Sequence, residues 1–150
     1  MPFEWIDFLQ LAATLEATPS ANAGEALWRT VASRAYYACF HAGLAVAARH
    51  GYSRWKVYEF ASRRDVQAGV SATATSSTTL GSHEHLIEWL SSREANQDLV
   101  AVGDALRGLK DQRVWADYHV RVRRFCRKNA SYTLKEADRF FNEALEKLRP

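Results

Sequence analysis

The sequence predicts an all-α protein built as an up-and-down bundle of four to five principal helices. The 150 residues include only three prolines and seven glycines, and alanine, the strongest helix former, is abundant. Apolar residues recur at helical spacing in several segments, whereas no strand-like alternation persists anywhere in the sequence. The length suits one domain, so we expect residues 1–150 to form a single helical domain.

Two helices are expected in the first third of the chain. Residues 3–17 place apolar side chains at helical spacing, and Pro19 ends the run. A long helix is expected from about Asn22 to His50, with Gly51 as its C-terminal stop. Small and branched residues give this helix a seam suited to close packing: Leu27, Val31, Ala35, Ala38 and Ala42.

The middle of the chain changes in composition. Residues 52–65 are basic and aromatic and indicate no clear secondary structure. Over about 66–81 the sequence consists mainly of Ser, Thr, Ala and Gly. Such a segment buries too little apolar surface to offset its ordering entropy, so we expect a mobile surface loop there.

Three further helices are expected in the second half. The first covers about 82–92, and the next covers roughly 97–118. The last is expected to begin at Thr133, which with Glu136 has the pattern of a capping box. The longest of the three carries an apolar stripe: Leu99, Val102, Leu106 and Leu109.

Composition and charge favour a cytoplasmic globular protein. Hydrophobic residues make up 47% and charged residues 25%, and a net charge of +3 permits a nucleic-acid partner without requiring one. Cys39 and Cys126 fit neither metal-ligand spacing nor a disulfide framework, so we expect reduced thiols. Residues 1–5 lack the pattern of a signal peptide, and the longest apolar stretch, 35–48, is too short to span a bilayer. We therefore expect no export and no membrane role.

Two polar segments stand out among the apolar residues. Residues 33–41 read SRAYYACFH and residues 113–119 read RVWADYH. Each joins an arginine to a histidine within about two helical turns. Arginine is a permanent cation whose fork of donors fits phosphate, and histidine titrates near neutral pH. A phosphate grip beside a proton-transfer group suits the cleavage of RNA without a metal.

These segments resemble the HEPN superfamily (higher eukaryotes and prokaryotes nucleotide-binding), specifically its small stand-alone prokaryotic members. Residues 33–41, a helix opening with Ser82-His83, and Arg113 followed by residues 116–118 (ADY) carry the resemblance in the right order. It spans about residues 20–148, because the final helix is also similar at four positions: Thr133, Glu136, Ala137 and Ala144.

The resemblance implies a helical bundle, commonly paired as a homodimer with polar residues facing a central cleft. Many members are metal-independent endoribonucleases of toxin–antitoxin and antiviral defence systems, and they use an arginine followed a few residues later by a histidine. Others bind nucleotides or RNA without catalysis, or accompany a small nucleotidyltransferase. No cofactor is implied.

Two pairs fit that arginine–histidine pattern, although Ala35 and Val114 stand where the usual motif has a polar residue. Arg34 and His41 are seven residues apart and share one helix face. Arg113 and His119 are about 240° apart on a regular helix, so they share a face only if the helix ends near residue 118.

We favour Arg113 and His119 as the catalytic pair, because Arg113 stands where the superfamily has its nuclease motif. His119 is expected to exchange a proton with the ribose 2′-hydroxyl or the leaving oxygen, and Arg113 to hold the phosphate, giving 2′,3′-cyclic phosphate ends. A second subunit would supply the complementary histidine. The supporting cleft is expected to contain Arg34, Tyr37, His41, His83, Asp117 and Tyr118.

Two other interpretations stay open. The same residues suit a buried polar network that fixes helix register, with Arg34 or Arg113 against Asp117 and with Tyr37 and Tyr118 beside it. They also suit a nucleotide or RNA pocket without chemistry, in a module that acts with a nucleotidyltransferase.

A basic segment follows the second motif. An interleaved aromatic, Phe125, makes it suited to a phosphodiester backbone and one stacked base, although a solvated face is the alternative. No metal is expected, since His83 and His85 diverge by about 200° on a helix. RNA or a nucleotide is the expected ligand, and an antitoxin is another possible partner. The RNA-binding candidates in the basic segment are Arg121, Arg123, Arg124, Arg127 and Lys128.

Overall fold

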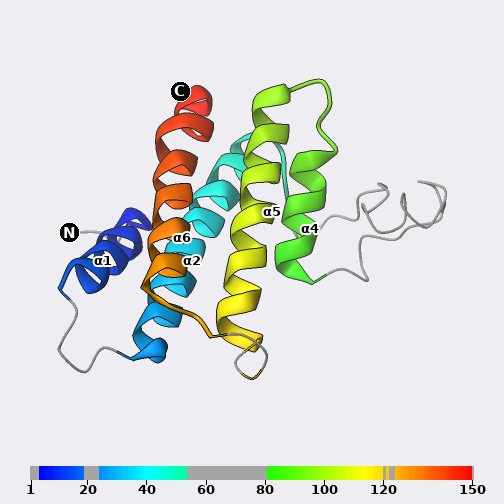
Figure 1. Cartoon of the computed structure of the whole chain (residues 1–150). Helices are drawn as coiled ribbons and strands as arrows, with labels where there is room; N and C mark the ends of the chain where they lie inside the picture. Colours follow the sequence, from blue (N-terminus) through cyan, green and yellow to red (C-terminus); the bar gives the residue numbers. More distant parts are fainter. Residues whose placement is uncertain (1–3, 19–23, 54–80, 120, 122–123, 150) are drawn as a thin grey trace.

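The computed structural model describes residues 4–18, 24–53, 81–119, 121 and 124–149. All regular structure in these residues is helical, which confirms the all-α prediction (Figure 1). The expected loop over 66–81 lies outside the described residues except for Gly81. The elements are α1 (Ile6–Ala17), α2 (Glu25–Arg49), α4 (Ser82–Ser91), α5 (Gln97–Tyr118), α6 (Arg127–Arg139), the π-helix η3 (Phe140–Ala144) and the 3₁₀ helix η4 (Glu146–Leu148).

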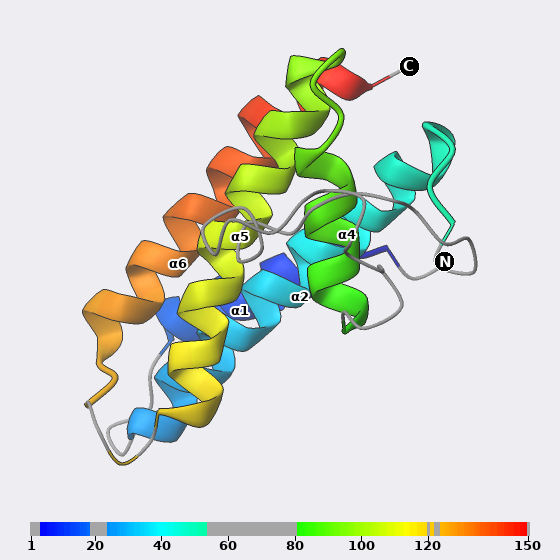
Figure 2. The same cartoon turned by 90° about the vertical axis from the view of Figure 1, so that its right-hand side faces the viewer.

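The long helix α2 lies at the centre of the bundle. It packs against α1, α5 and α6, while α4 packs mainly on α5 (Figures 1 and 2). Helix α5 runs antiparallel to both α4 and α6, as an up-and-down arrangement requires. Within the described ranges, no helix is long and apolar enough to cross a membrane.

Most helix boundaries agree with the sequence signals. Helix α2 ends at Arg49, and Gly51 adopts a φ of 93°, the left-handed conformation typical of a C-terminal stop. Asn96 caps α5, because its side-chain oxygen accepts hydrogen bonds from the backbone N–H groups of Asp98 and Leu99 at 3.2 and 3.3 Å.

The expected start of the last helix is wrong. Helix α6 begins at Arg127, and Asn129 supplies its cap by accepting a hydrogen bond from the backbone N–H of Cys126 at 3.0 Å. Thr133 is buried inside the helix, where its hydroxyl donates to the carbonyl of Asn129 at 3.0 Å. A threonine that bonds back to the carbonyl four residues earlier needs no helix start, so the capping-box pattern was misleading.

The predicted apolar stripes form the core. Leu99, Val102, Leu106 and Leu109 of α5 are buried, as are Val31, Ala35 and Ala38 of α2. Helices α2 and α5 approach closely at Gly43, which has no side chain. A Cβ atom on Gly43 would lie 2.8 Å from Leu106.

The last helix changes its hydrogen bonding at η3. The backbone N–H of Leu145 donates to the carbonyl of Phe140 at 2.9 Å, five residues back rather than four. Phe140 and Leu145 are both buried, so this wide turn keeps two core side chains on the same side of the helix.

A glycine pair on α5 tests the packing against α4. A Cβ atom on Gly103 would lie 2.9 Å from both the Cβ of Leu90 and the backbone nitrogen of Ser91, whereas nothing lies within 4 Å at the exposed Gly108. We expect Gly103→Ala to lower the free energy of unfolding by about 1–3 kcal/mol through overpacking. Gly108→Ala should raise it by about 1 kcal/mol through helix propensity. Urea denaturation measures both, and equal effects at the two positions would contradict this packing.

Candidate functional site

Arg113 of α5 is held in a fixed orientation by α2 and by its own helix. Its Nε lies 2.7 Å from a carboxylate oxygen of Asp117, and its Nη2 donates to the hydroxyls of Tyr37 at 3.0 Å and Tyr118 at 3.4 Å. The guanidinium carbon lies 5.4 Å from the ring centre of Tyr37 and 5.2 Å from that of Tyr118. Burial lowers the pKa of Arg113, but the contacts with Tyr37 and Asp117 outweigh it, so the pKa rises and the cation persists.

His83, in the first turn of α4, meets α2. Its Nδ1 shares a hydrogen bond of 2.6 Å with the hydroxyl of Tyr36. The imidazole stacks on Phe40 with ring centres 4.0 Å apart and meets Tyr37 edge-on at 6.0 Å. The expectation that His83 lies in the same polar cluster therefore agrees with its contacts.

The surroundings of His83 favour its neutral form. Burial lowers its pKa, and the positive charges of Arg113 and Lys110 and the neighbouring His41 lower it further. Burial also raises the pKa of Tyr36 well above its ordinary range, so its hydroxyl keeps its proton. The pair is thus an uncharged imidazole bonded to a protonated phenol at neutral pH.

His41 connects α2 to the N-terminal helix. Its ring stacks on Trp5 with ring centres 3.7 Å apart and an interplanar angle of 10°, and it also stacks on Tyr37 at 6.4 Å. Burial lowers the pKa of His41. The rings of Trp5 and Phe8 are stacked with their centres 6.1 Å apart. The guanidinium carbon of Arg34 lies 5.3 Å from the ring centre of Phe8.

These contacts form one continuous row of flat groups with an arginine near each end. Arg34 is exposed at one end and Tyr118 is 65% exposed at the other, so the row follows the surface. The two predicted arginines do not converge, because Arg34 packs on α1 and Arg113 packs between two tyrosines. We call it the aromatic row, and its members in order are Arg34, Phe8, Trp5, His41, Tyr37, Arg113 and Tyr118.

His119 follows the last residue of α5 directly. The helix ends at Tyr118, and His119 is exposed, with its backbone N–H donating to the carbonyl of Trp115 at 3.3 Å. The contacts described for Arg113 include none with His119. The polar network that the sequence left open is present, since Arg113 pairs with Asp117, and Ser33 donates to the same carboxylate at 3.4 Å.

Ion pairs fix α4 on α5. Arg107 binds Glu84 at 2.9 Å and Glu88 at 2.6 Å, and Lys110 also pairs with Glu84. Burial raises the pKa of Glu84, but its bonds with the two cations outweigh burial and lower it. Because Glu84 is adjacent to His83 in sequence, this network fixes the first turn of α4, which carries His83, against α5.

Arg29 secures the end of α5, and the sequence did not single it out. Its buried guanidinium donates to the carbonyls of Trp115, at 3.0 Å, and Ala116, and it pairs with Glu25 one turn earlier. Glu25 in turn accepts a hydrogen bond from the backbone N–H of Phe125 at 3.0 Å. An acid four residues before an arginine was the available sequence signal.

The basic segment is only partly free. Arg121, Arg124 and Lys128 are exposed, while Arg127 pairs with Glu16 at 3.0 Å, and Arg123 lies outside the described residues. The expectation that the interleaved aromatic stacks a base is wrong. The side chain of Phe125 is 1% exposed and packs edge-on against Trp115 of α5.

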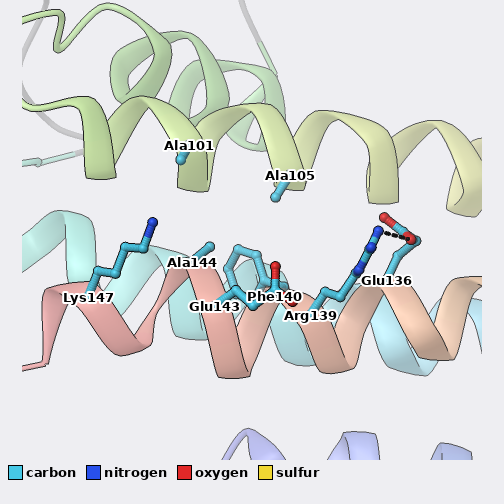
Figure 3. A pocket seen from close by; sticks show the side chains of 8 residues that line it. All are labelled: Ala101, Ala105, Glu136, Arg139, Phe140, Glu143, Ala144 and Lys147. Carbon is cyan, nitrogen blue, oxygen red and sulfur yellow. Dashed lines mark hydrogen bonds and ion pairs between the residues drawn. The ribbon is translucent and has the colours of Figure 1, made fainter.

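A separate groove lies between α5 and the last helix (Figure 3). It encloses about 280 Å³, with an apolar floor that includes Ala105 and a charged rim that includes Arg139. Ala105 is eight residues before Arg113, so the groove lies about 12 Å along the helix from that arginine. In the described ranges, no group of three or more His, Cys, Asp or Glu residues could hold a metal ion.

Comparison with protein-family models, with curated proteins and with solved structures finds no match for this chain. The sequence features and the geometry of the aromatic row are therefore the basis for its function. The row contains two guanidinium groups, one imidazole and partly exposed aromatic rings. His83 lies beside Tyr37 and adds a second imidazole next to the row.

The lowered histidine pKa values predict acid sensitivity. Below about pH 6.5 the unfolded chain protonates its histidines, whereas burial opposes protonation of His41, His83 and His85 in the folded chain. Because the unfolded state then binds more protons, the free energy of unfolding should fall as pH decreases through this value. Urea denaturation at several pH values between 7.5 and 5.5 measures this decrease in the free energy of unfolding. The decrease should be smaller in the His83→Gln variant. A parent protein whose stability stays level or increases across this window would contradict the prediction.

Proposed function

We propose that this chain is a HEPN-like, RNA-directed protein that cleaves RNA without a metal, in the cytoplasm and as part of a toxin–antitoxin or antiviral defence system. The observation that carries the proposal is the half-buried guanidinium of Arg113, held between Tyr37 and Tyr118 at the surface. The resemblance of the two polar segments to the superfamily supports the reaction class.

Arg113 is suited to grip a phosphate. Asp117 forms an ion pair with the guanidinium on the Nε side, and the hydroxyls of Tyr37 and Tyr118 accept hydrogen bonds from Nη2, while no described residue bonds Nη1. Its orientation is thus fixed before a ligand arrives, and donors that are fixed in advance stabilise developing charge best. The pairing with Asp117 leaves the guanidinium partly neutralised, so the phosphate binds through directed hydrogen bonds as well as through charge.

His119 is the proposed proton-transfer group. It is exposed and immediately follows Tyr118, where a strand bound at Arg113 would pass. The ribose 2′-oxygen loses its proton to an imidazole and attacks phosphorus, and the 5′-oxygen leaves with a proton from a second imidazole. The products are a 2′,3′-cyclic phosphate and a 5′-hydroxyl. We propose that the second imidazole comes from the other subunit of a homodimer.

One observation favours a second candidate function. Arg113 already pairs with Asp117 and bonds two tyrosines, and its described contacts do not include His119. A non-catalytic module would use the same surface to bind RNA or a nucleotide, together with a nucleotidyltransferase partner. It would keep its affinity for RNA and cleave none.

Cleavage assays in EDTA test the catalytic proposal. We expect the parent to cut single-stranded RNA to 2′,3′-cyclic phosphate ends and to leave 2′-deoxy strands intact. Arg113→Ala should slow cleavage by about 10²–10³-fold, and His119→Ala by about 10²–10⁴-fold. Arg139→Ala, an exposed arginine in the separate groove, is the matched control and should cut at the parent's rate. Unchanged rates in both site variants would remove these residues from the mechanism.

Salt titrations test the contribution of the basic segment. Each phosphate contact on a single strand contributes about −0.7 to the slope of log K against log salt concentration. Replacing the exposed Arg121 and Arg124 by Gln should weaken RNA binding and make this slope about 1.4 units less steep. Lys135→Gln with Arg139→Gln removes two exposed cations from α6 and should leave the slope unchanged. Equal slopes in the two double variants would show that this segment is only a solvated face.

A further inference from the structure

His83 lies beside the proposed reaction centre but takes no part in the proposed proton transfers. We propose that the uncharged Nε2–H of His83 is a further catalytic group, which donates a hydrogen bond to a phosphate oxygen of the strand bound at Arg113. Tyr36 is the positioning residue that keeps this proton on Nε2. The inference rests on the proposed function and adds a contact with the substrate that neither arginine–histidine pair contains.

The buried hydroxyl of Tyr36 fixes the tautomer of His83. Tyr36 is fully buried, and the one described hydrogen-bond partner of its hydroxyl is Nδ1 of His83 at 2.6 Å. A buried hydroxyl that donates to nothing costs free energy, so its hydrogen points to Nδ1. A neutral imidazole has one N–H group, and the nitrogen that accepts this bond does not carry it. The proton of His83 is therefore on Nε2.

The Nε2 atom of His83 is open to a ligand. His83 is half-buried, its Nε2 bonds no described residue, and this atom is not among the buried side-chain atoms that lack a partner. The ring is restrained by stacking on Phe40 at 4.0 Å and by the edge contact with Tyr37 at 6.0 Å. The N–H donor thus has a fixed direction before a ligand binds.

Tyr37 connects this donor to the proposed phosphate site. Its ring contacts His83, and the guanidinium carbon of Arg113 lies 5.4 Å from the centre of the same ring. The positive charges of Arg113 and Lys110 act on His83, since both lower its pKa. A positive potential favours an anionic ligand, and phosphate is the anion that a nucleic-acid strand offers at every nucleotide.

The uncharged state of His83 determines what the side chain does. An imidazolium would repel the guanidinium of Arg113, whereas a neutral ring adds a donor without this repulsion. Because Nδ1 is bonded to Tyr36, the ring has no free lone pair with which to take a proton from the 2′-hydroxyl. A neutral imidazole N–H is also too weak an acid to protonate the leaving oxygen. His83 therefore stabilises charge on the phosphate, and both proton transfers remain with the other imidazoles.

Two amide replacements separate the donor from the packing of the ring. His83→Gln places an amide near the position of Nε2, whereas His83→Asn places one near Nδ1, within reach of Tyr36 only. The full chain is assayed for RNA cleavage in EDTA. We expect His83→Gln to keep most of the parent's rate, although an amide is neither acid nor base. His83→Asn should be slower by about 10- to 150-fold, the loss of one hydrogen bond to a charged group. Thermal melts followed by circular dichroism confirm that each variant is folded.

NMR spectroscopy tests the tautomer independently of activity. In ¹H–¹⁵N spectra of the imidazole rings at neutral pH, with His83→Gln identifying the signals of His83, we expect a proton on Nε2 and none on Nδ1. Tyr36→Phe removes the hydroxyl, so it should give a mixture of the two tautomers and slow cleavage. Tyr132→Phe, at an exposed tyrosine of α6, is the matched control and should change neither.

A proton on Nδ1 in the parent would overturn the proposal, as would equal cleavage rates for His83→Gln and His83→Asn. Both results leave the proposed cleavage intact if Arg113→Ala still slows it. A parent that cuts no RNA contradicts the proposed cleavage instead. Fluorescence anisotropy with a labelled 2′-O-methyl RNA strand then compares the same two variants by affinity. Equal affinities, or no binding by the parent, would overturn the contact with His83 as well.

Discussion

The buried guanidinium of Arg29 holds together the three segments on which the candidate site depends. It donates to two carbonyls in the last turn of α5 and pairs with Glu25 of α2, and Glu25 accepts the backbone N–H of Phe125. An arginine keeps its charge at any physiological pH, so its burial requires these acceptors. The end of α5, which carries Arg113 and the residues after it, is thereby fixed to α2.

Given that anchor, Tyr37 is the meeting point of the candidate site. Its hydroxyl accepts a hydrogen bond from Arg113, and its ring contacts His41 of its own helix and His83 of α4. The ion pairs of Glu84 with Arg107 and Lys110 fix α4 against α5. The site therefore depends on contacts between α2 and α5, between α2 and α4, and between α4 and α5, rather than on either sequence motif alone. This arrangement explains why motifs far apart in the sequence share one surface.

Sequence patterns predicted the helices more accurately than the contacts between them. The limits of α5 follow from the spacing of its apolar residues, and the stop at Gly51 follows from the backbone conformation of one residue. Both depend only on residues that are close in the sequence. The contacts of Trp5 with His41 and of Arg34 with Phe8 join different helices, so no spacing within one segment indicates them. The packing of Arg34 on Phe8, away from the tyrosines that hold Arg113, was missed for the same reason, although both arginines were expected at one cleft. The burial of Phe125 was also missed, because its basic neighbours suggested solvent.

The wide turn between Phe140 and Leu145 has a consequence for how the chain length can vary. In an ordinary α-helix, side chains four residues apart lie on one face, whereas here the two buried side chains are five apart. A relative lacking one residue in this interval would close the turn into regular α-helix and keep the same pair in the interior. Deleting one residue from a regular helix normally rotates every later side chain away from its packing partners. The wide turn between Phe140 and Leu145 accommodates such a deletion without this rotation.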